Sequence, residues 1–414
     1  MSSGVTLAAK TPGPPRFARD RLVHGWFAVK GVSDAGDAAW TIALAWTAVQ
    51  LASPAVAGLV VAAGTLPRAC VLLFGGVVAD RFATGAVLRL VTAARLVVLV
   101  LTLVVLWIDG ATLPLVIAAA VAFGACDAVF EPSAATLGRQ LVRADDLAPY
   151  ASASQTSSRL GTMLGAACGG ALVAVGGMSA AALANAATYA AVLGYLTILR
   201  PRFPLPRSTA GPVLGAIADG FHHLRTESVA RRLVLTLSGL NLAVGPALGI
   251  GLTLRAHGQD WGAGVLGALQ ACVGFGALVG ALALLRWRPR REALFGFRLL
   301  VLQGLAIAGL AVPHIAVNAA ACAVIGVTSG AASALLSAVF QKSVTPQFLG
   351  RLAAIQRLGD DVLMPAAMAG FGALAAGTSL PVAFGVFGAA MTLLTGATAV
   401  GERRPHHAPT RTAD

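Results

Sequence analysis

Long apolar stretches alternate with short polar gaps along the whole chain. A helix needs roughly 20 apolar residues to cross the hydrocarbon core of a bilayer. Twelve stretches meet this requirement, at 24–50, 54–79, 87–108, 113–137, 149–175, 178–199, 233–254, 262–285, 293–312, 316–340, 353–376 and 380–400. The pattern predicts an all-α membrane protein with twelve transmembrane helices.

The longest polar gap, 200–232, divides these stretches into two groups of six. It contains four prolines and an amphipathic piece, so we expect a cytoplasmic linker with an amphipathic helix on the membrane surface. The predicted organisation is a six-helix bundle at 24–199 and a second at 233–400. A cytoplasmic N-tail at 1–23 and a C-tail at 401–414 complete the chain.

Composition supports the membrane assignment. Apolar residues make up 57 % of the chain and charged residues 11 %, which is too little polar surface to coat a soluble globule. The net charge of +13 is spread over short gaps rather than one soluble domain, so we expect no nucleic-acid partner. The lipid bilayer is the expected partner.

The positions of the 30 Lys and Arg residues predict the topology. With Arg89, at the start of the third stretch, counted in the gap before it, the tails and every second gap hold 23 of them, six others lie within apolar stretches, and the opposite gaps hold only Arg255. Loops rich in Lys and Arg stay in the cytoplasm, so both termini are predicted to be cytoplasmic.

A short charged turn follows the second apolar stretch. Gly76 lies near the end of the stretch, and Asp80 and Arg81 mark the water boundary. These residues resemble the loop motif between helices two and three of the major facilitator superfamily, although Thr84 and Gly85 replace its basic pair. The resemblance implies a fold of two six-helix bundles, with Asp80 capping a helix of the other half and Arg81 locking a cytoplasmic network.

The fifth apolar stretch carries four glycines that resemble the motif of drug:proton antiporters in the same superfamily. Ala166 replaces the proline of that motif. The spacing places glycines on one helical face, where a neighbouring helix can approach closely. The alternative is small-residue packing common to any transporter. The four glycines are Gly161, Gly165, Gly169 and Gly170.

Further stretches resemble one exporter branch, similar to macrolide-efflux and enterobactin-export proteins. This resemblance implies export across a bacterial plasma (inner) membrane. The matching stretches begin at Ser33, Asp127, Gly220 and Gln341.

Ionisable residues inside apolar stretches are costly in lipid and therefore mark functional sites. Asp37 and Arg68 lie 13 and 14 residues from the outer ends of consecutive stretches, which places them at one depth near the midplane. Asp127 and Arg159 reach the same level, and Glu131 follows Asp127 by one helical turn. These residues are predicted to couple transport to protons, or alternatively to form a static ion-pair network that fixes helix register.

Three cations lie closer to the inner ends of their stretches. Lys30, Arg95 and Arg298 are expected to extend toward the interface, where their charged heads meet water.

Aromatic and amide side chains suggest how a substrate is held. Trp40, Phe123 and Phe130 lie on stretches one and four, which line the cavity in the superfamily, and suit an apolar or amphiphilic substrate. Asn241 and Gln270 are interpreted as helix-to-helix hydrogen-bonding residues or, alternatively, substrate contacts.

No phosphate-binding loop, nucleophile elbow or zinc-binding helix occurs in the sequence. We therefore expect neither an enzyme nor a metal or cofactor. The leading hypothesis is a monomeric secondary active transporter that exports amphiphilic small molecules, such as drugs or secondary metabolites, by alternating access coupled to protons. Alternatives are a siderophore or metabolite exporter of narrow specificity, a nutrient importer or uniporter, and a non-transporting membrane sensor or scaffold.

Overall fold

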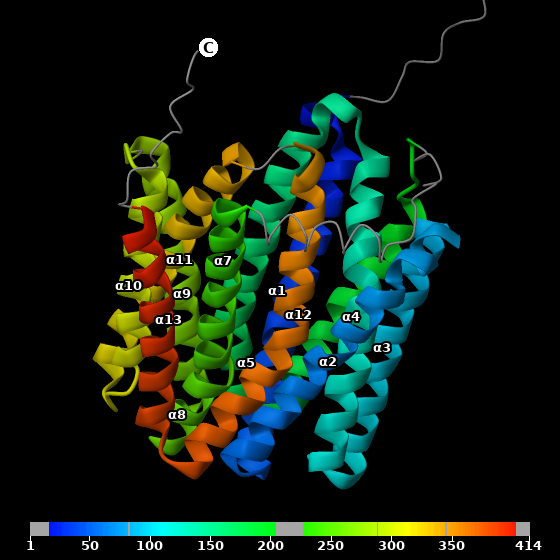
Figure 1. Cartoon of the computed structure of the whole chain (residues 1–414). Coiled ribbons are helices and arrows are strands. Elements are labelled where there is room, and N and C mark those ends of the chain that lie inside the picture. The colour runs from blue at the N-terminus through cyan, green and yellow to red at the C-terminus, as the bar shows by residue number, and fades with distance from the viewer. Residues whose placement is uncertain (1–15, 82, 204–226, 288, 344–345, 403–414) are drawn as a thin grey trace, which may run out of the picture.

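The computed structural model describes residues 16–81, 83–203, 227–287, 289–343 and 346–402. For 68–81, and for parts of 228–233, 341–358 and 398–402, it describes the backbone alone. Within these ranges all regular structure is helical, and Figure 1 shows the long helices packed side by side. The charged turn at Asp80 and Arg81 and the linker segment 204–226 lie outside the residues whose side chains are described.

The first half of the chain folds into long helices with very short connections. The expected turn between the fifth and sixth stretches falls at Gly176 and Gly177, where the backbone leaves the helical region and Gly177 adopts a positive φ of 59°. The last long segment therefore consists of two helical arms, 147–175 and 178–198. The elements are η1 (Phe17–Arg19), α1 (Arg21–Leu51), α2 (Pro54–Arg81), α3 (Thr84–Asp109), α4 (Leu113–Leu141), η2 (Ala144–Asp146) and α5 (Leu147–Ile198).

The second half differs from expectation in its first long stretch. The sequence predicts one helix over 233–254, but a π-helical turn, η3 (Ala247–Gly251), interrupts it. Pro246 directly precedes this turn and has no N–H to donate, so the regular hydrogen-bond ladder cannot continue through it. The other elements are α7 (Ser228–Pro246), α8 (Leu252–Gly258), α9 (Gly262–Arg286), α10 (Glu292–Gly309), α11 (Ile315–Ser343), α12 (Pro346–Gly377) and α13 (Leu380–Glu402).

Eight segments of the described chain are long and apolar enough to cross a membrane, with α5 counted as one segment. The charged α1 and α12 are not among them, and α2 contributes a shorter apolar stretch, Pro54–Pro67. The chain is therefore a multi-pass membrane protein. Twelve crossings and cytoplasmic termini stay predictions.

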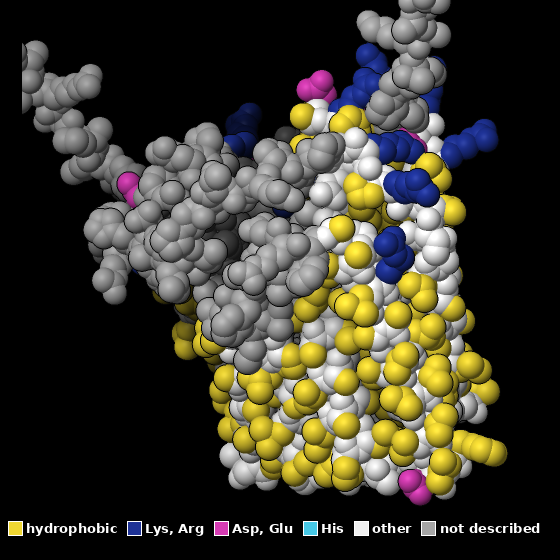
Figure 2. All heavy atoms as spheres, turned by 90° about the vertical axis from the view of Figure 1, so that its right-hand side faces the viewer, with side chains coloured by type: hydrophobic (Ala, Val, Ile, Leu, Met, Phe, Trp, Pro, Cys, Tyr) yellow, Lys and Arg dark blue, Asp and Glu magenta, His cyan; other side chains and the backbone are white. Residues whose placement is uncertain are grey.

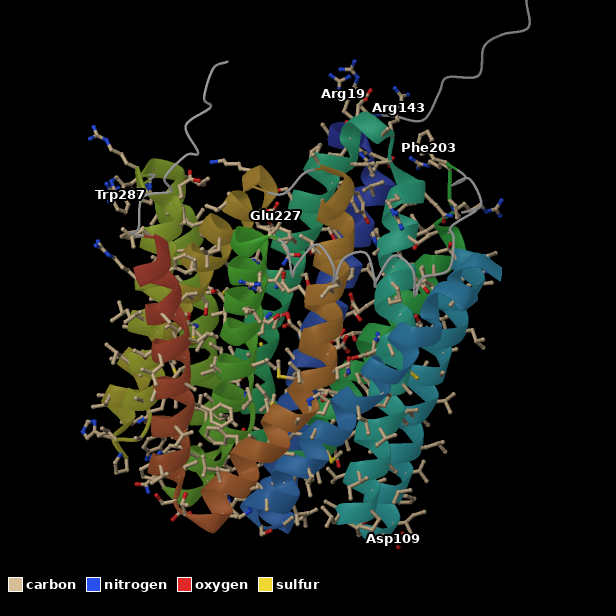
Figure 3. The ribbon with its side chains drawn as sticks, viewed as in Figure 1. Arg19, Asp109, Arg143, Phe203, Glu227 and Trp287 are labelled. Carbon is tan, nitrogen blue, oxygen red and sulfur yellow. The ribbon has the colours of Figure 1, made fainter. Side chains whose placement is uncertain are left out.

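The two ends of the molecule differ in charge. Helix α1 begins and α13 ends at the upper end in Figure 1, which we call the terminal end. Arg19, Arg143 and Glu227 also lie there, and Asp109 lies at the opposite, far end (Figure 3). Figure 2 shows Lys and Arg side chains gathered toward the terminal end, above a face covered by hydrophobic side chains. This distribution suits a bundle whose middle contacts lipid.

The hydrophobic cores show how the halves meet. The largest described cluster of buried side chains joins both halves, for example Trp40 and Leu99 with Ile250 and Phe371. Near the terminal end, one smaller cluster around Trp26 belongs to the first half alone and another belongs to the second half, at Leu284, Ala331 and Leu335. Among the described side chains, the halves share a core toward the far end and are separate at the terminal end.

Candidate functional site in the first half

A buried guanidinium joins three helices of the first half. Arg95 projects from α3 with a side chain only 1 % exposed. Its Nη2 donates a hydrogen bond to Oδ1 of Asp127 on α4, and its Nη1 lies 3.9 Å from Oδ2 of Asp37 on α1. The expectation that Arg95 extends to the interface is wrong. Arg95 instead serves as the shared counter-ion of two carboxylates.

Aromatic rings enclose this guanidinium. The Arg95 Cζ atom lies 4.1 Å from the centroid of Phe130, 5.3 Å from Tyr189 and 5.6 Å from Phe123. Such cation–π contacts stabilise a cation that has left water. Trp40 packs on Phe123 with centroids 5.9 Å apart and is fully buried. The sequence predicts Trp40, Phe123 and Phe130 as a substrate surface. The structure places them around Arg95, and their contact with a substrate stays a prediction.

Asp37 has a second set of partners on the second arm of α5. Its Oδ1 accepts hydrogen bonds from Nδ2 of Asn185 at 3.3 Å and from the hydroxyl of Tyr189. Asn185 and Tyr189 are fully buried, whereas the side chains of Asp37 and Asp127 are 26 % and 23 % exposed. The network therefore combines a fixed interior with two carboxylates that remain accessible.

A second cation bridge lies closer to the terminal end. Lys30 Nζ lies 2.8 Å from Oδ1 of Asp34, one helical turn away on α1, and 4.0 Å from Oε1 of Glu131 on α4. Lys30 is only 13 % exposed at its side chain, so it does not extend freely to the interface as the sequence predicts. Glu131 is the most open member of this group, at 55 % exposed.

Each cation of the two bridges is shared by two carboxylates. Among the side chains described here, Arg95 lies between Asp37 and Asp127, and Lys30 lies between Asp34 and Glu131. A carboxylate that shares its cation can take up a proton while the cation keeps an ionised partner. The arrangement is chemically suited to reversible proton uptake.

Several predicted site residues lie elsewhere. Arg159 has an exposed side chain on α5, and among the described ion pairs none joins it to Asp37 or Asp127. The Arg68 side chain and the Gly76, Asp80 and Arg81 motif fall in the stretch of α2 described by its backbone alone.

The predicted amides of the second half make hydrogen bonds between elements. Asn241 Nδ2 on α7 donates to Oδ2 of Asp360 on α12 at 2.7 Å. Gln270 Nε2 on α9 donates to the carbonyl of Leu248 at 3.4 Å, inside the π-helical turn. These contacts agree with the helix-to-helix role expected for both residues.

The glycines of α5 form close contacts in two directions. A methyl group on Gly161, Gly165 or Gly169 would clash with the α1 backbone or a side chain at its surface. A methyl group on Gly170 would instead clash with Ala263 and Gly267 on α9, in the second half. The first arm of α5 therefore lies wedged between α1 and the second half. The α1 residues that meet the three glycines are Gly31, Asp34, Ala35 and Ala39.

Sequence reasoning missed three members of the network, namely Arg95 as a buried ligand, Asn185 and Tyr189. The sequence does contain a signal for Arg95. Thr92, Arg95 and Thr102 recur at helical spacing within an apolar stretch, which places them on one helical face. The structure shows that this face is buried. No comparable signal links Asn185 and Tyr189 to Asp37, about 150 positions away. The described residues contain no group of three or more His, Cys, Asp or Glu that could hold a metal ion.

Comparisons with known proteins address the family. No curated protein matches the chain by sequence. A solved nucleoside transporter NupG has a TM-score of 0.70 at 12 % identity, covering 93 % of this chain and 100 % of that one. A bacterial homologue of the iron transporter ferroportin, in an inward-facing state, has a TM-score of 0.73 at 15 % identity and covers 93 % and 99 %. A POT family transporter in complex with 5-aminolevulinic acid has a TM-score of 0.71 at 11 % identity and covers 94 % and 97 %.

The sequence itself matches a protein-family profile over most of its length. The profile is that of the Major Facilitator Superfamily, and the match covers residues 27–362. This range includes α1 through most of α12, and with it the whole charged network described above. The chain belongs to the Major Facilitator Superfamily.

Proposed function

We propose that this protein is a secondary active transporter that exports amphiphilic small molecules from a bacterial cell in exchange for protons. The observation that carries the proposal is the sharing of one buried guanidinium, Arg95, by two partly exposed carboxylates, Asp37 and Asp127. A carboxylate in such a site can gain a proton without leaving an unpaired charge behind, because Arg95 keeps its other partner.

Proton binding at Asp37 would change how α1 is held. With both acids ionised, Arg95 attracts α1 through Asp37 and α4 through Asp127. A neutral Asp37 keeps its hydrogen bonds to α5 but loses the charge attraction to α3. The attraction that holds α1 to α3 therefore differs between the two protonation states of Asp37. A transport cycle requires such a difference in interactions.

Helix α1 also reaches the contact between the halves. Near its far end, the ring of Trp46 packs edge-on against His257 of α8, with centroids 5.8 Å apart. The middle of α1 packs on the glycines of α5. Gly170, also on α5, contacts Gly267 of α9 in the second half. A shift of α1 would thus act on the interface that must open when access alternates.

The arrangement of the cores supports an inward-open state. Among the described side chains, the first-half members of the shared cluster lie toward the far end, and the first-half cluster around Trp26 near the terminal end includes no residue of the second half. If the terminal end is cytoplasmic, as the distribution of Lys and Arg predicts, the site faces the cytoplasm and can accept a substrate for export. The similar ferroportin homologue was also solved inward-facing.

The amphiphilic substrate class rests on two features. The four glycines of α5 match the spacing of drug:proton antiporters, and three of them do bring α5 against α1. The site also combines carboxylates with buried aromatic surface, as sites for amphiphilic ligands do.

Efflux of a panel of amphiphilic dyes from a pump-deficient bacterium tests this proposal. Wild-type cells should expel dye until a protonophore collapses the gradient, and Asp37→Asn should abolish gradient-driven efflux because an amide cannot carry the proton. Asp109→Asn is the matched control, since Asp109 is exposed at the far end and lies outside the network. Wild-type rates in Asp37→Asn would overturn the coupling role. Unchanged accumulation of every dye in wild-type cells would overturn export of this substrate class.

A further inference from the structure

The two oxygens of Asp37 have different surroundings. Oδ1 accepts two hydrogen bonds, from the Tyr189 hydroxyl and from the Asn185 amide. Oδ2 faces Nη1 of Arg95 at 3.9 Å, which is beyond hydrogen-bond distance. Donors to Oδ1 leave this oxygen poorly placed to take a proton, whereas none of the described side chains donates a hydrogen bond to Oδ2.

The donors to Oδ1 are themselves fixed in place. The Thr188 hydroxyl lies 2.8 Å from the backbone carbonyl oxygen of Asn185 and 3.0 Å from its side-chain oxygen, and shares its one proton between them. The side-chain oxygen of Asn185 thus faces Thr188, and its NH₂ group faces Asp37. On α1, a methyl group at Gly36 would collide with Asn185 and Thr188, so the glycine is what allows the second arm of α5 to approach.

We propose that Tyr189 is a positioning residue that, with Asn185, occupies Oδ1 of Asp37, directs the transported proton to Oδ2 and sets the pH range over which Asp37 loads. This inference deepens the proton exchange proposed above and rests on it. Tyr189 itself neither gains nor loses its proton in the cycle.

The loading step balances simply. A hydronium ion in the accessible space beside Asp37 transfers a proton to a lone pair on Oδ2, one O–H bond forms as another breaks, and a water molecule leaves. The Asp37 side chain becomes neutral, and Arg95 retains Asp127 as its ionised partner. Release reverses the transfer.

Charged and titratable groups from each neighbouring helix act on Asp37. Asp37 is also attracted by Lys30, which belongs to the second cation bridge, closer to the terminal end. The Arg68 side chain on α2 lies outside the described residues. The charged and titratable groups that act on Asp37 are Arg95 on α3, Asp127 on α4, Tyr189 on α5 and Lys30 on α1 itself. Removing the Tyr189 hydroxyl leaves the other three in place.

Tyr189→Phe tests the inference in proteoliposomes with a fixed dye substrate. The phenylalanine ring preserves the packing on Arg95, whose Cζ lies 5.3 Å from the ring centroid, and removes only the hydroxyl. Ionised Asp37 loses a donor, so protonation becomes easier and the pH of half-maximal transport should rise by about one unit, as expected for a hydrogen bond to a charged group. The maximal rate should stay within a few-fold of wild type.

Tyr195→Phe provides a matched control. Tyr195 lies on the same arm of α5 and also donates its hydroxyl to α1, but to the carbonyl oxygen of Leu22 at 2.7 Å. Its removal should leave the pH profile unchanged. An equal shift in both variants would overturn the assignment to Tyr189.

Asp37→Asn separates this inference from the proposal on which it rests. If Asp37→Asn abolishes proton-driven transport while Tyr189→Phe keeps the wild-type pH profile, Tyr189 has no positioning role and proton exchange at Asp37 stands. If Asp37→Asn transports as wild type does, both fail. Should Tyr189→Phe not accumulate in the membrane, Asn185→Ala decides, because it removes the other donor to Oδ1 of Asp37. Loss of this donor should raise the midpoint in the same direction, and an unchanged midpoint overturns the inference.

Discussion

At the scale of single residues, Arg95 is the most deeply buried of the charged residues described in the first half. Its side chain is almost fully buried, and Nε and Nη1 have no hydrogen-bond partner among the described residues. A buried cation of this kind is tolerated because a carboxylate and aromatic faces replace its hydration. Its removal should therefore harm stability more than the loss of an exposed arginine.

Arg95→Met should lower the free energy of unfolding by about 3–5 kcal/mol, the usual cost of breaking a buried ion pair from one side. Adding Asp127→Asn removes the stranded charge and should restore part of the loss. Thermal unfolding in detergent micelles measures both. Arg298→Met, at an exposed position on α10, is the control and should unfold near the wild-type temperature. Coinciding curves for the Arg95 and Arg298 variants would contradict the buried-pair assignment.

The sequence locates the acids of this site but not their partners. Counting residues along a stretch gives the depth of a side chain, which is why Asp37 and Asp127 are correctly expected at one level. Depth carries no information on the direction around the helix axis. For this reason the sequence predicts Arg95 at the interface and assigns no role to Tyr189. Both residues belong to the site because their side chains face α1, and that of Arg95 also faces α4.

At the scale of elements, the glycines of the first arm of α5 bring its backbone into close contact with α1. Gly165 faces Ala35 of α1 so closely that a methyl group would overlap its backbone. Gly194, on the second arm of the same element, has open space at the equivalent position. Alanine substitutions at these two glycines therefore distinguish the effect of packing against α1 from the general preference of helices for alanine.

Gly165→Ala should destabilise the protein by about 1–3 kcal/mol, because the added methyl overpacks the α1 contact. Gly194→Ala should be neutral or stabilise by up to about 1 kcal/mol, since alanine favours the helix and meets nothing. Unfolding temperatures and dye efflux of the two variants test this contrast. Equal effects in both would show that α1 and α5 do not pack as described.

Helix positions follow closely from the apolar stretches, and even the turn at Gly176 and Gly177 is visible in the sequence. The π-helical turn was not predicted. Pro246 indicates that the helical hydrogen-bond pattern is interrupted. Whether the helix kinks, ends or widens into a π-helical turn there depends on neighbouring helices. One such neighbour is Gln270, which donates to a carbonyl within the turn.

At the scale of the whole molecule, membrane orientation follows from charge placed at one end. Figure 3 places Arg143 at the terminal end and Asp109 at the far end. Both side chains are exposed. Cysteines at these two positions therefore report on opposite sides of the membrane.

In a background with the five native cysteines replaced, Asp109→Cys should react with a membrane-impermeant maleimide in intact cells. Arg143→Cys should react only after permeabilisation, because Lys- and Arg-rich loops stay in the cytoplasm. Gel-shift labelling reads both outcomes. The reverse pattern would place the termini outside and would also reverse the proposed direction of transport.

Charge counts and apolar stretches predict the two-bundle architecture because both act along the chain. The contact between the halves depends on surfaces far apart in sequence, such as Gly170 on α5 against Gly267 on α9. Gly170 belongs to the glycine motif of its stretch, but no feature of the sequence distinguishes Gly267 as its partner, so the sequence does not predict this pairing.

Gly169 and Gly170 are consecutive in the chain, yet one faces Ala39 of α1 and the other faces α9. Two adjacent residues thus contact two different helices, and neither can gain a side chain without disturbing one of these contacts. We therefore expect both glycines to be retained when the protein evolves to transport a new compound. Substitutions that change substrate preference should instead occur on helix faces with more space.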